Sequence, residues 1–128
     1  MSELSDFLEQ TFLEITLKGA TAYNVPTPYL ALFIDDPTDA GSGTECSWNN
    51  YIRQAMSFGE ITDGSVSTDA AITFAAIEGA QVTITHVAIF DSEINGNVLY
   101  HTPLDVNKTL SVDDIMSMPI GGFTVTIA

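Results

Sequence analysis

Apolar residues near the N-terminus recur at three- and four-residue spacing, which predicts an amphipathic α-helix over residues 1–19. The apolar positions are Leu4, Phe7, Leu8, Phe12 and Ile15, with Leu13 and Leu17 widening the stripe. Ser2 or Ser5 is suited to cap the start of this helix, and Lys18 followed by Gly19 is typical of a helix end. We expect the apolar face to pack either against the protein's own sheet or against a partner.

From residue 20 onward the pattern changes to short apolar runs separated by clusters of turn-forming residues, which is typical of strands joined by tight turns. The predicted strands cover residues 29–34, 51–58, 71–76, 82–90, 98–104, 106–112 and 122–127. Asp63-Gly64 and Asn95-Gly96 mark two of the turns. The sequence therefore predicts a mainly β fold, an antiparallel β-sandwich of about seven or eight short strands over residues 20–128. With the N-terminal helix it forms a single domain spanning residues 1–128.

Alternation assigns the side chains of residues 51–58 to two faces of a strand. The set expected to face inward is Ile52, Gln54, Met56 and Phe58, and the outward set is Tyr51, Arg53, Ala55 and Ser57. Arg53 is one of only 3 basic residues in the chain. Because a guanidinium can donate two hydrogen bonds to one carboxylate, we expect Arg53 to form an ion pair, either within the chain or with the next subunit.

Residues 82–90 form the most strand-like segment of the chain. One of its faces is expected to hold Val82, Ile84, His86, Ala88 and Phe90. A hairpin about Asn95-Gly96 brings His86 and His101 onto adjacent strands, and the register decides whether they share a face. Two histidines are fewer than the ligands of a typical metal site. We therefore expect hydrogen-bonded strand residues, with no metal and no cofactor.

The charge of the chain is strongly unbalanced, with 17 acidic residues against 3 basic ones and a net charge of −14. Such a field repels a phosphate backbone, so we expect no nucleic-acid partner. It suits a solvated exterior and can also complement a basic partner surface. No apolar run approaches the roughly 20 residues needed to cross a bilayer, and the N-terminus carries Glu3 and Asp6 instead of the basic residues of a secretory signal. We expect a soluble protein with no membrane partner.

The sequence lacks the common motifs of nucleophilic, phosphate-binding and zinc-dependent enzymes, so it predicts no catalytic residue. Cys46 stands alone, which rules out an internal disulfide framework. The loop over residues 35–45 is acidic, but its spacing does not match a helical calcium loop. A solvated turn is the favoured interpretation of this loop, while a cation site and a contact with a neighbouring subunit are alternatives.

Several segments together resemble a known family. They include YLALF at residues 29–33, DPTDAGSGTE at 36–45, RQA at 53–55, THVAIFD at 85–91 and NVLYH at 97–101. The chain resembles small structural proteins of tailed bacteriophages, which are variously described as head-decoration, minor tail or tail-fibre proteins. The resemblance covers about the last hundred residues. It implies a non-enzymatic protein of the phage particle, assembled in the host cytoplasm.

Within this family we expect a capsid cement or decoration protein that bridges capsid subunits and stabilises the head, because the chain is one small domain without a repetitive shaft. Its partner would be the major capsid protein of the same phage, and a homo-oligomer, with a trimer favoured, would suit the symmetry of a particle. The alternative is a tail-fibre, minor tail or adaptor protein that contacts tail proteins or a host glycan. The candidate partner-binding residues are Leu4, Phe7, Leu8, Phe12, Asp36, Asp39, Glu45, Trp48 and Arg53.

Overall fold

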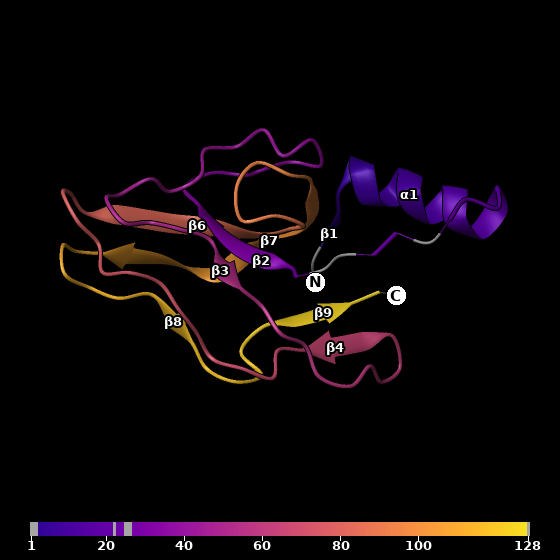
Figure 1. Cartoon of the computed structure of the whole chain (residues 1–128). Coiled ribbons are helices and arrows are strands. Elements are labelled where there is room, and N and C mark those ends of the chain that lie inside the picture. The colour runs from indigo at the N-terminus through magenta and orange to yellow at the C-terminus, as the bar shows by residue number, and fades with distance from the viewer. Residues whose placement is uncertain (1–2, 22, 25–26, 128) are drawn as a thin grey trace.

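The computed structural model describes residues 3–21, 23–24 and 27–127 and shows one helix near the N-terminus beside a β-rich body (Figure 1). Its elements are β1 (Glu3–Leu4), α1 (Asp6–Leu17), β2 (Tyr29–Phe33), β3 (Gln54–Ala55), β4 (Ser65–Ser67), β5 (Ile72–Thr73), β6 (Val82–Phe90), β7 (Val98–Leu110), β8 (Ser117–Met118) and β9 (Thr124–Thr126). All strand pairings among these elements are antiparallel. The predicted mainly β fold with one N-terminal helix is confirmed.

The two longest strands, β6 and β7, pair within a five-stranded sheet whose order is β1-β7-β6-β2-β3. β2 pairs with β6 along its whole length, so that Leu32 lies opposite Val87 and Ala31 lies opposite Ala88. Two separate two-stranded ribbons, β4–β9 and β5–β8, complete the body. β7 is one continuous strand where the sequence predicts two, because its residues pair with β6 as far as Leu110.

One face of the five-stranded sheet packs with the two ribbons and buries the main hydrophobic core. Leu30, Leu32 and Val87 of the sheet are fully buried there, in the same cluster as Ile72 and Val125 of the ribbons. The other buried members of this cluster are Cys46, Met56, Phe74, Ile84, Ile89, Leu99, Met116, Met118 and Phe123. Each layer buries the apolar side of the other, which gives the expected sandwich-like arrangement.

The opposite face of the sheet carries a second, smaller apolar cluster: Ala31, Phe33, Ala88, Phe90 and Val98. The loop that follows β2 turns back onto this sheet. The Ile34 N–H donates to the Thr44 carbonyl oxygen at 3.1 Å, and the Cys46 N–H donates to the Leu32 carbonyl oxygen at 2.8 Å. A Cβ atom at Gly41 of this loop would lie 3.0 Å from the Val98 side chain, so the loop covers the cluster closely.

The predicted helix begins later than its apolar spacing suggests. Leu4 belongs to β1 and lies opposite Tyr100 of β7, so its assignment to the helix is wrong. The Ser5 N–H donates to the Leu99 carbonyl oxygen, and the Ser5 side chain accepts a hydrogen bond from the Leu8 N–H at 3.1 Å. Ser5 is therefore the N-cap, as one of the two alternatives predicts; Ser2 lies outside the described residues.

Two of the predicted strand patterns differ from the structure. Within residues 51–58 only Gln54–Ala55 forms a strand, and Ile52, expected inside, is 55% exposed. Along β6 the pairing with β7 is irregular between Ile84 and His86. Since this irregularity changes the alternation, Ile84 joins the main core, whereas His86 lies opposite Phe33 on the other side of the sheet.

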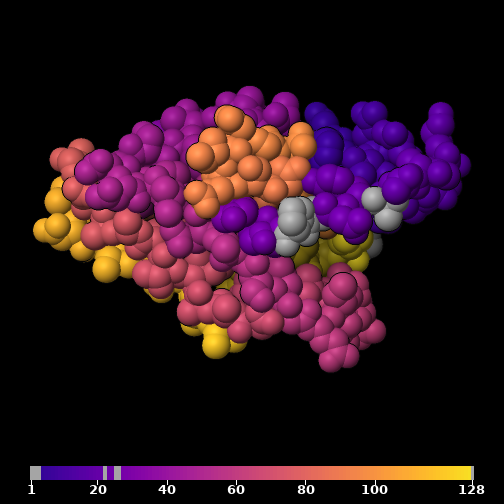
Figure 2. Space-filling view, viewed as in Figure 1, coloured from indigo at the N-terminus to yellow at the C-terminus, as the bar shows by residue number. Residues whose placement is uncertain are grey.

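Helix α1 lies at one end of the body and extends away from it (Figures 1 and 2). Its first turn packs against the main core through Phe7 and Leu8. Further along, Phe12, Leu13 and Leu17 are 53%, 54% and 76% exposed, and no residue of the helix is fully buried. Within the described residues, no helix has the length and apolarity to cross a bilayer.

Candidate partner-binding surfaces

Arg53 and Glu45 form a bidentate ion pair on the side of the sheet that carries the smaller apolar cluster. Arg53 Nε lies 3.0 Å from Glu45 Oε2, and Arg53 Nη2 lies 2.9 Å from Glu45 Oε1. The guanidinium stacks over the Phe90 ring at 3.6 Å from the ring centroid. The side chains are only 9% and 23% exposed, so the pair is largely shielded from water. The expected ion pair of Arg53 is confirmed, and it lies within the chain.

Tyr51 links this ion pair to the backbone of β2 through hydrogen bonds of its hydroxyl. Its hydroxyl donates to Glu45 Oε2 at 2.7 Å and accepts a hydrogen bond from the Leu32 N–H at 3.0 Å. Burial, together with the bond to Glu45, raises the pKa of Tyr51 well above its usual value. Burial and the neighbouring Glu45 carboxylate likewise raise the pKa of the Cys46 thiol to about 12. Both groups are therefore held in their neutral forms.

Trp48 lies beside this network, in an open groove of about 520 Å³. The groove is lined by Glu45, Cys46, Ser47, Trp48, Tyr51, Ile52, Arg53, Glu93, Ile94 and Asn95. The Trp48 ring meets the Tyr51 ring edge-on at 4.9 Å between centroids. An aromatic side chain next to carboxylates and an amide is a surface on which a polar ligand with an apolar face can rest.

The acidic loop places Asp36 and Asp39 near buried His101. Asp39 Oδ1 lies 2.7 Å from His101 Nε2, and the Asp39 carbonyl oxygen accepts a hydrogen bond from the Asp6 N–H at 3.0 Å. Asp36 instead accepts from the Thr38 N–H at 2.8 Å, which stabilises the turn of the loop. His101 lies opposite Ala88, two residues along β6 from His86, so the two histidines are diagonal neighbours on one face.

Carboxylates from two parts of the chain meet at the start of α1. Ligand oxygens of Asp6, Glu9 and Asp39 lie within 4.8 Å of one another, and all three side chains are exposed. Three carboxylates can hold a divalent cation, but exposed acidic groups often gather without one. The amino-acid sequence alone does not single out this group, because the contact between residue 39 and the helix depends on the packing of the loop after β2.

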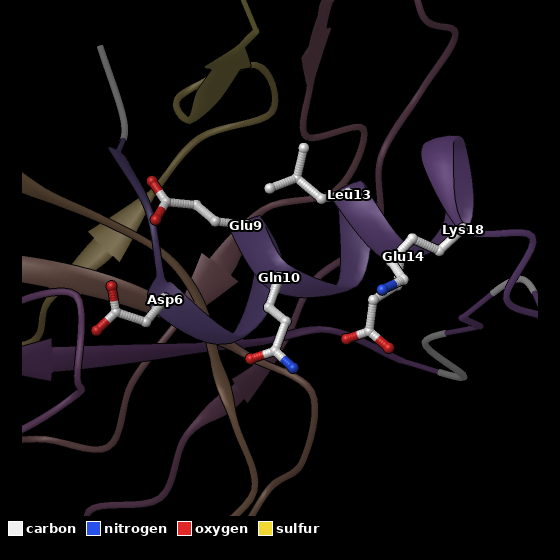
Figure 3. A pocket seen from close by; sticks show the side chains of 6 residues that line it. All are labelled: Asp6, Glu9, Gln10, Leu13, Glu14 and Lys18. Carbon is white, nitrogen blue, oxygen red and sulfur yellow. The ribbon is translucent and has the colours of Figure 1, made fainter.

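The outward side of α1 borders an open, shallow pocket with a volume of about 600 Å³ (Figure 3). The pocket is lined by Asp6, Glu9, Gln10, Leu13, Glu14 and Lys18. Of the predicted partner-binding residues on the helix, Phe12 is exposed, whereas Phe7 and Leu8 contribute to the core. Leu13 and Leu17, which the sequence places at the edge of the apolar stripe, are also exposed. Periodicity cannot show which apolar residues of this helix stay exposed, because they occur around most of its circumference.

The chain matches a family model described as podophage GP4 fiber I protein gp80, over residues 3–126. A search of curated proteins finds no match. The family match spans β1, α1 and all the strands of the body, and it confirms the resemblance to structural proteins of phage particles. The chain therefore belongs to the family described as podophage GP4 fiber I protein gp80, a family of phage virion structural proteins.

Proposed function

We propose that this protein is a structural component of the phage tail fibre. The observation that carries the proposal is the family match over residues 3–126, since the description of that family names a fibre protein. The match favours the tail-fibre alternative over a capsid cement protein. A small domain without a repetitive shaft is compatible with a fibre, because a fibre can be assembled from several chains, each of which is small.

The chemistry of the described residues supports a role in holding surfaces together rather than in catalysis. A nucleophile needs a lowered pKa or a neighbouring base. Burial does the opposite at Cys46 and at Tyr51, where the pKa is raised. Arg53, the most enclosed cation, is already bonded to Glu45 and to the carbonyl oxygens of Ser92 and Asn95. A homo-oligomer, with a trimer favoured, stays part of the proposal because virion components are symmetric.

Immunogold electron microscopy of intact particles tests this proposal. An antibody against the purified chain should label the tail fibres and leave the head shell unlabelled. Particles from a phage that lacks the gene, grown with the protein supplied in trans and without it, give the matched control. Label spread over the whole icosahedral shell would reject the fibre role and restore the cement hypothesis.

A second candidate role, recognition of a host saccharide, is favoured by the groove beside Trp48. Aromatic rings can stack on the apolar face of a sugar, while Glu93 and Asn95 offer hydrogen-bond partners at the same groove. Surface polysaccharide from the host should shift the indole N–H resonance of Trp48, the single tryptophan of the chain. Polysaccharide from a phage-resistant strain is the control. A spectrum that does not change with host polysaccharide would reject this role.

A further inference from the structure

The helix α1 presents apolar side chains on the side that faces away from the body. Leu13 and Leu17 are four residues apart and therefore share one face. Each is two residues from the half-buried Ile15, which places it about 160° around the helix from Ile15 at 3.6 residues per turn. Leu13 and Leu17 are 54% and 76% exposed, and Phe12 on the flank is 53% exposed. Leu13 and Leu17 form what we call the outer apolar face of α1, and Phe12 borders this face, about 100° around the helix from Leu13.

Nothing in the described residues covers the end of this helix. Gly19, which follows the C-cap residue Lys18, has a positive φ of 70°, and the Ala20 N–H donates to the Glu14 carbonyl oxygen, so the helix is properly terminated. A Cβ atom at Gly19 would meet no other atom within 4 Å. The helix is therefore complete as a secondary-structure element, while its outer side and its C-terminal end are available for contact.

Acidic side chains border the outer apolar face. Asp6 and Glu9 lie on the same outward side as Leu13 (Figure 3). Asp39 from the loop after β2 adds a third carboxylate within 4.8 Å of theirs. Like charges at this spacing repel one another, and a cationic surface brought against them would relieve the repulsion. The surface thus combines an apolar centre with an acidic edge.

The charges of the chain decide among the possible occupants. A second copy carries the same net charge of −14, and its cations are only Lys18, Arg53 and Lys108. Arg53 is bonded to Glu45, so few cations are available to meet the acidic edge. An anionic lipid surface would be repelled for the same reason. A different protein with a basic, apolar groove meets both requirements.

We propose that the outer apolar face of α1 docks into a groove of another protein of the virion, lined by aliphatic side chains and edged by lysine or arginine. This inference rests on the proposed function, since it takes the partner from the same particle. The mode is that of an amphipathic helix in a groove, with Leu13 and Leu17 as the anchors. A helix of 12 residues is about 18 Å long, which is enough for two or three successive anchors. The β body remains free beyond the contact.

Site-specific photo-crosslinking in assembled particles identifies the occupant. A photoreactive phenylalanine analogue replaces Leu17, and in a separate control it replaces Ile120, which is 68% exposed and belongs neither to α1 nor to the groove beside Trp48. The probe at position 17 should crosslink to a different virion protein, at a peptide that contains lysine or arginine among apolar residues. Crosslinks only to a second copy of this chain, or only to lipid, would overturn the inference. So would the absence of any crosslink in particles that contain the protein.

A paired substitution measures how much the face contributes to attachment. The double variant Leu13→Ser, Leu17→Ser should reduce the copies per purified particle at least tenfold in a phage that lacks its own gene. The control Ile61→Ser, Ile120→Ser changes two residues that are 73% and 68% exposed and should attach normally. Equal unfolding midpoints in urea verify that both variants fold. Normal attachment of the folded helix variant would overturn the inference.

The outcomes separate this inference from the proposed function. If antibodies label the fibre while the helix variant attaches normally, the docking inference fails and the fibre role stands. If the probe at Leu17 crosslinks to a basic groove of a capsid protein, the fibre role fails and the docking inference stands.

Discussion

Replacing Arg53 with alanine should destabilise the fold more than any other substitution of a basic residue in this chain. Arg53 is bonded to both carboxylate oxygens of Glu45, at 2.9 and 3.0 Å, and stacks on Phe90. Its Nη1 also donates to the carbonyl oxygens of Ser92 and Asn95, at 3.0 and 2.7 Å. One side chain therefore joins the loop after β2 to the loop between β6 and β7.

The expected loss in the free energy of unfolding follows from the Glu45 carboxylate, which Arg53→Ala leaves without its partner. Glu45 is only 23% exposed, so without Arg53 its carboxylate would be poorly hydrated and without its counter-ion. Removing one partner of a buried ion pair typically costs about 3–5 kcal/mol. Because Glu45 has some access to water and keeps the Tyr51 hydroxyl at 2.7 Å, we expect the lower end, about 3 kcal/mol. Arg53→Lys should cost about 2 kcal/mol, since it loses the fork and one charge-assisted hydrogen bond.

Urea unfolding followed by the fluorescence of Trp48 measures these losses. Urea is preferable to guanidinium chloride, because a salt would screen the interaction under test. The matched control is Lys108→Ala, an exposed cation on β7, which should change the free energy of unfolding by less than about 0.5 kcal/mol. A loss below about 1 kcal/mol for Arg53→Ala would refute the argument that this pair stabilises the two loops.

Three further predictions concern the helix N-cap, the Cys46 thiol and the stability of the fold at acidic pH. Ser5→Ala removes the acceptor for the Leu8 N–H and should lower the free energy of unfolding by about 1 kcal/mol; an unchanged urea midpoint would contradict the capping role. Burial raises the pKa of Cys46 to about 12, so the folded protein should resist a thiol-reactive disulfide reagent near pH 8 and react only when urea unfolds it; rapid labelling of the folded chain would count against this. Burial alone would raise the pKa of Asp91, but the hydrogen bonds that Tyr23 and Asn97 donate lower it. A lowered folded-state pKa contributes stability above the unfolded-state pKa of about 4, and this is lost as the pH falls through the folded-state value. Tyr23→Phe should therefore lessen the loss of stability on acidification, measured as urea midpoints between about pH 5 and 3; an identical pH dependence would contradict the role of the Tyr23 hydroxyl.

The sequence predicts the elements of this fold best where a run is rich in apolar, aromatic and β-branched residues and turn-forming residues flank it. β2 and β6 are such runs, and both occur where the pattern indicates. The faces of β6 are less predictable, because the irregular pairing between Ile84 and His86 depends on β7 and not on the composition of β6 itself. Leu4 fits the helical spacing, yet pairing with Tyr100 draws it into a strand.

The candidate surfaces likewise combine features that the sequence predicts with features that depend on tertiary packing. A planar guanidinium in a chain rich in carboxylates predicts an ion pair, and Arg53 has one. Alternation assigns Arg53 to the outward set, which is wrong, because its side chain is only 9% exposed. Glu45, which neutralises it, and Phe90, on which it stacks, approach it through tertiary packing that alternation cannot predict. The exposure of Leu13 and Leu17 also depends on tertiary structure, since among the described residues it is the first turn of α1 that packs against the core.

A cryo-electron microscopy map of the intact particle would locate this protein and show what α1 contacts. We expect density for the two-layered β body within the tail fibre, with α1 seated in a basic groove of a neighbouring protein. Density for this fold on the capsid surface, and none in the fibre, would contradict it.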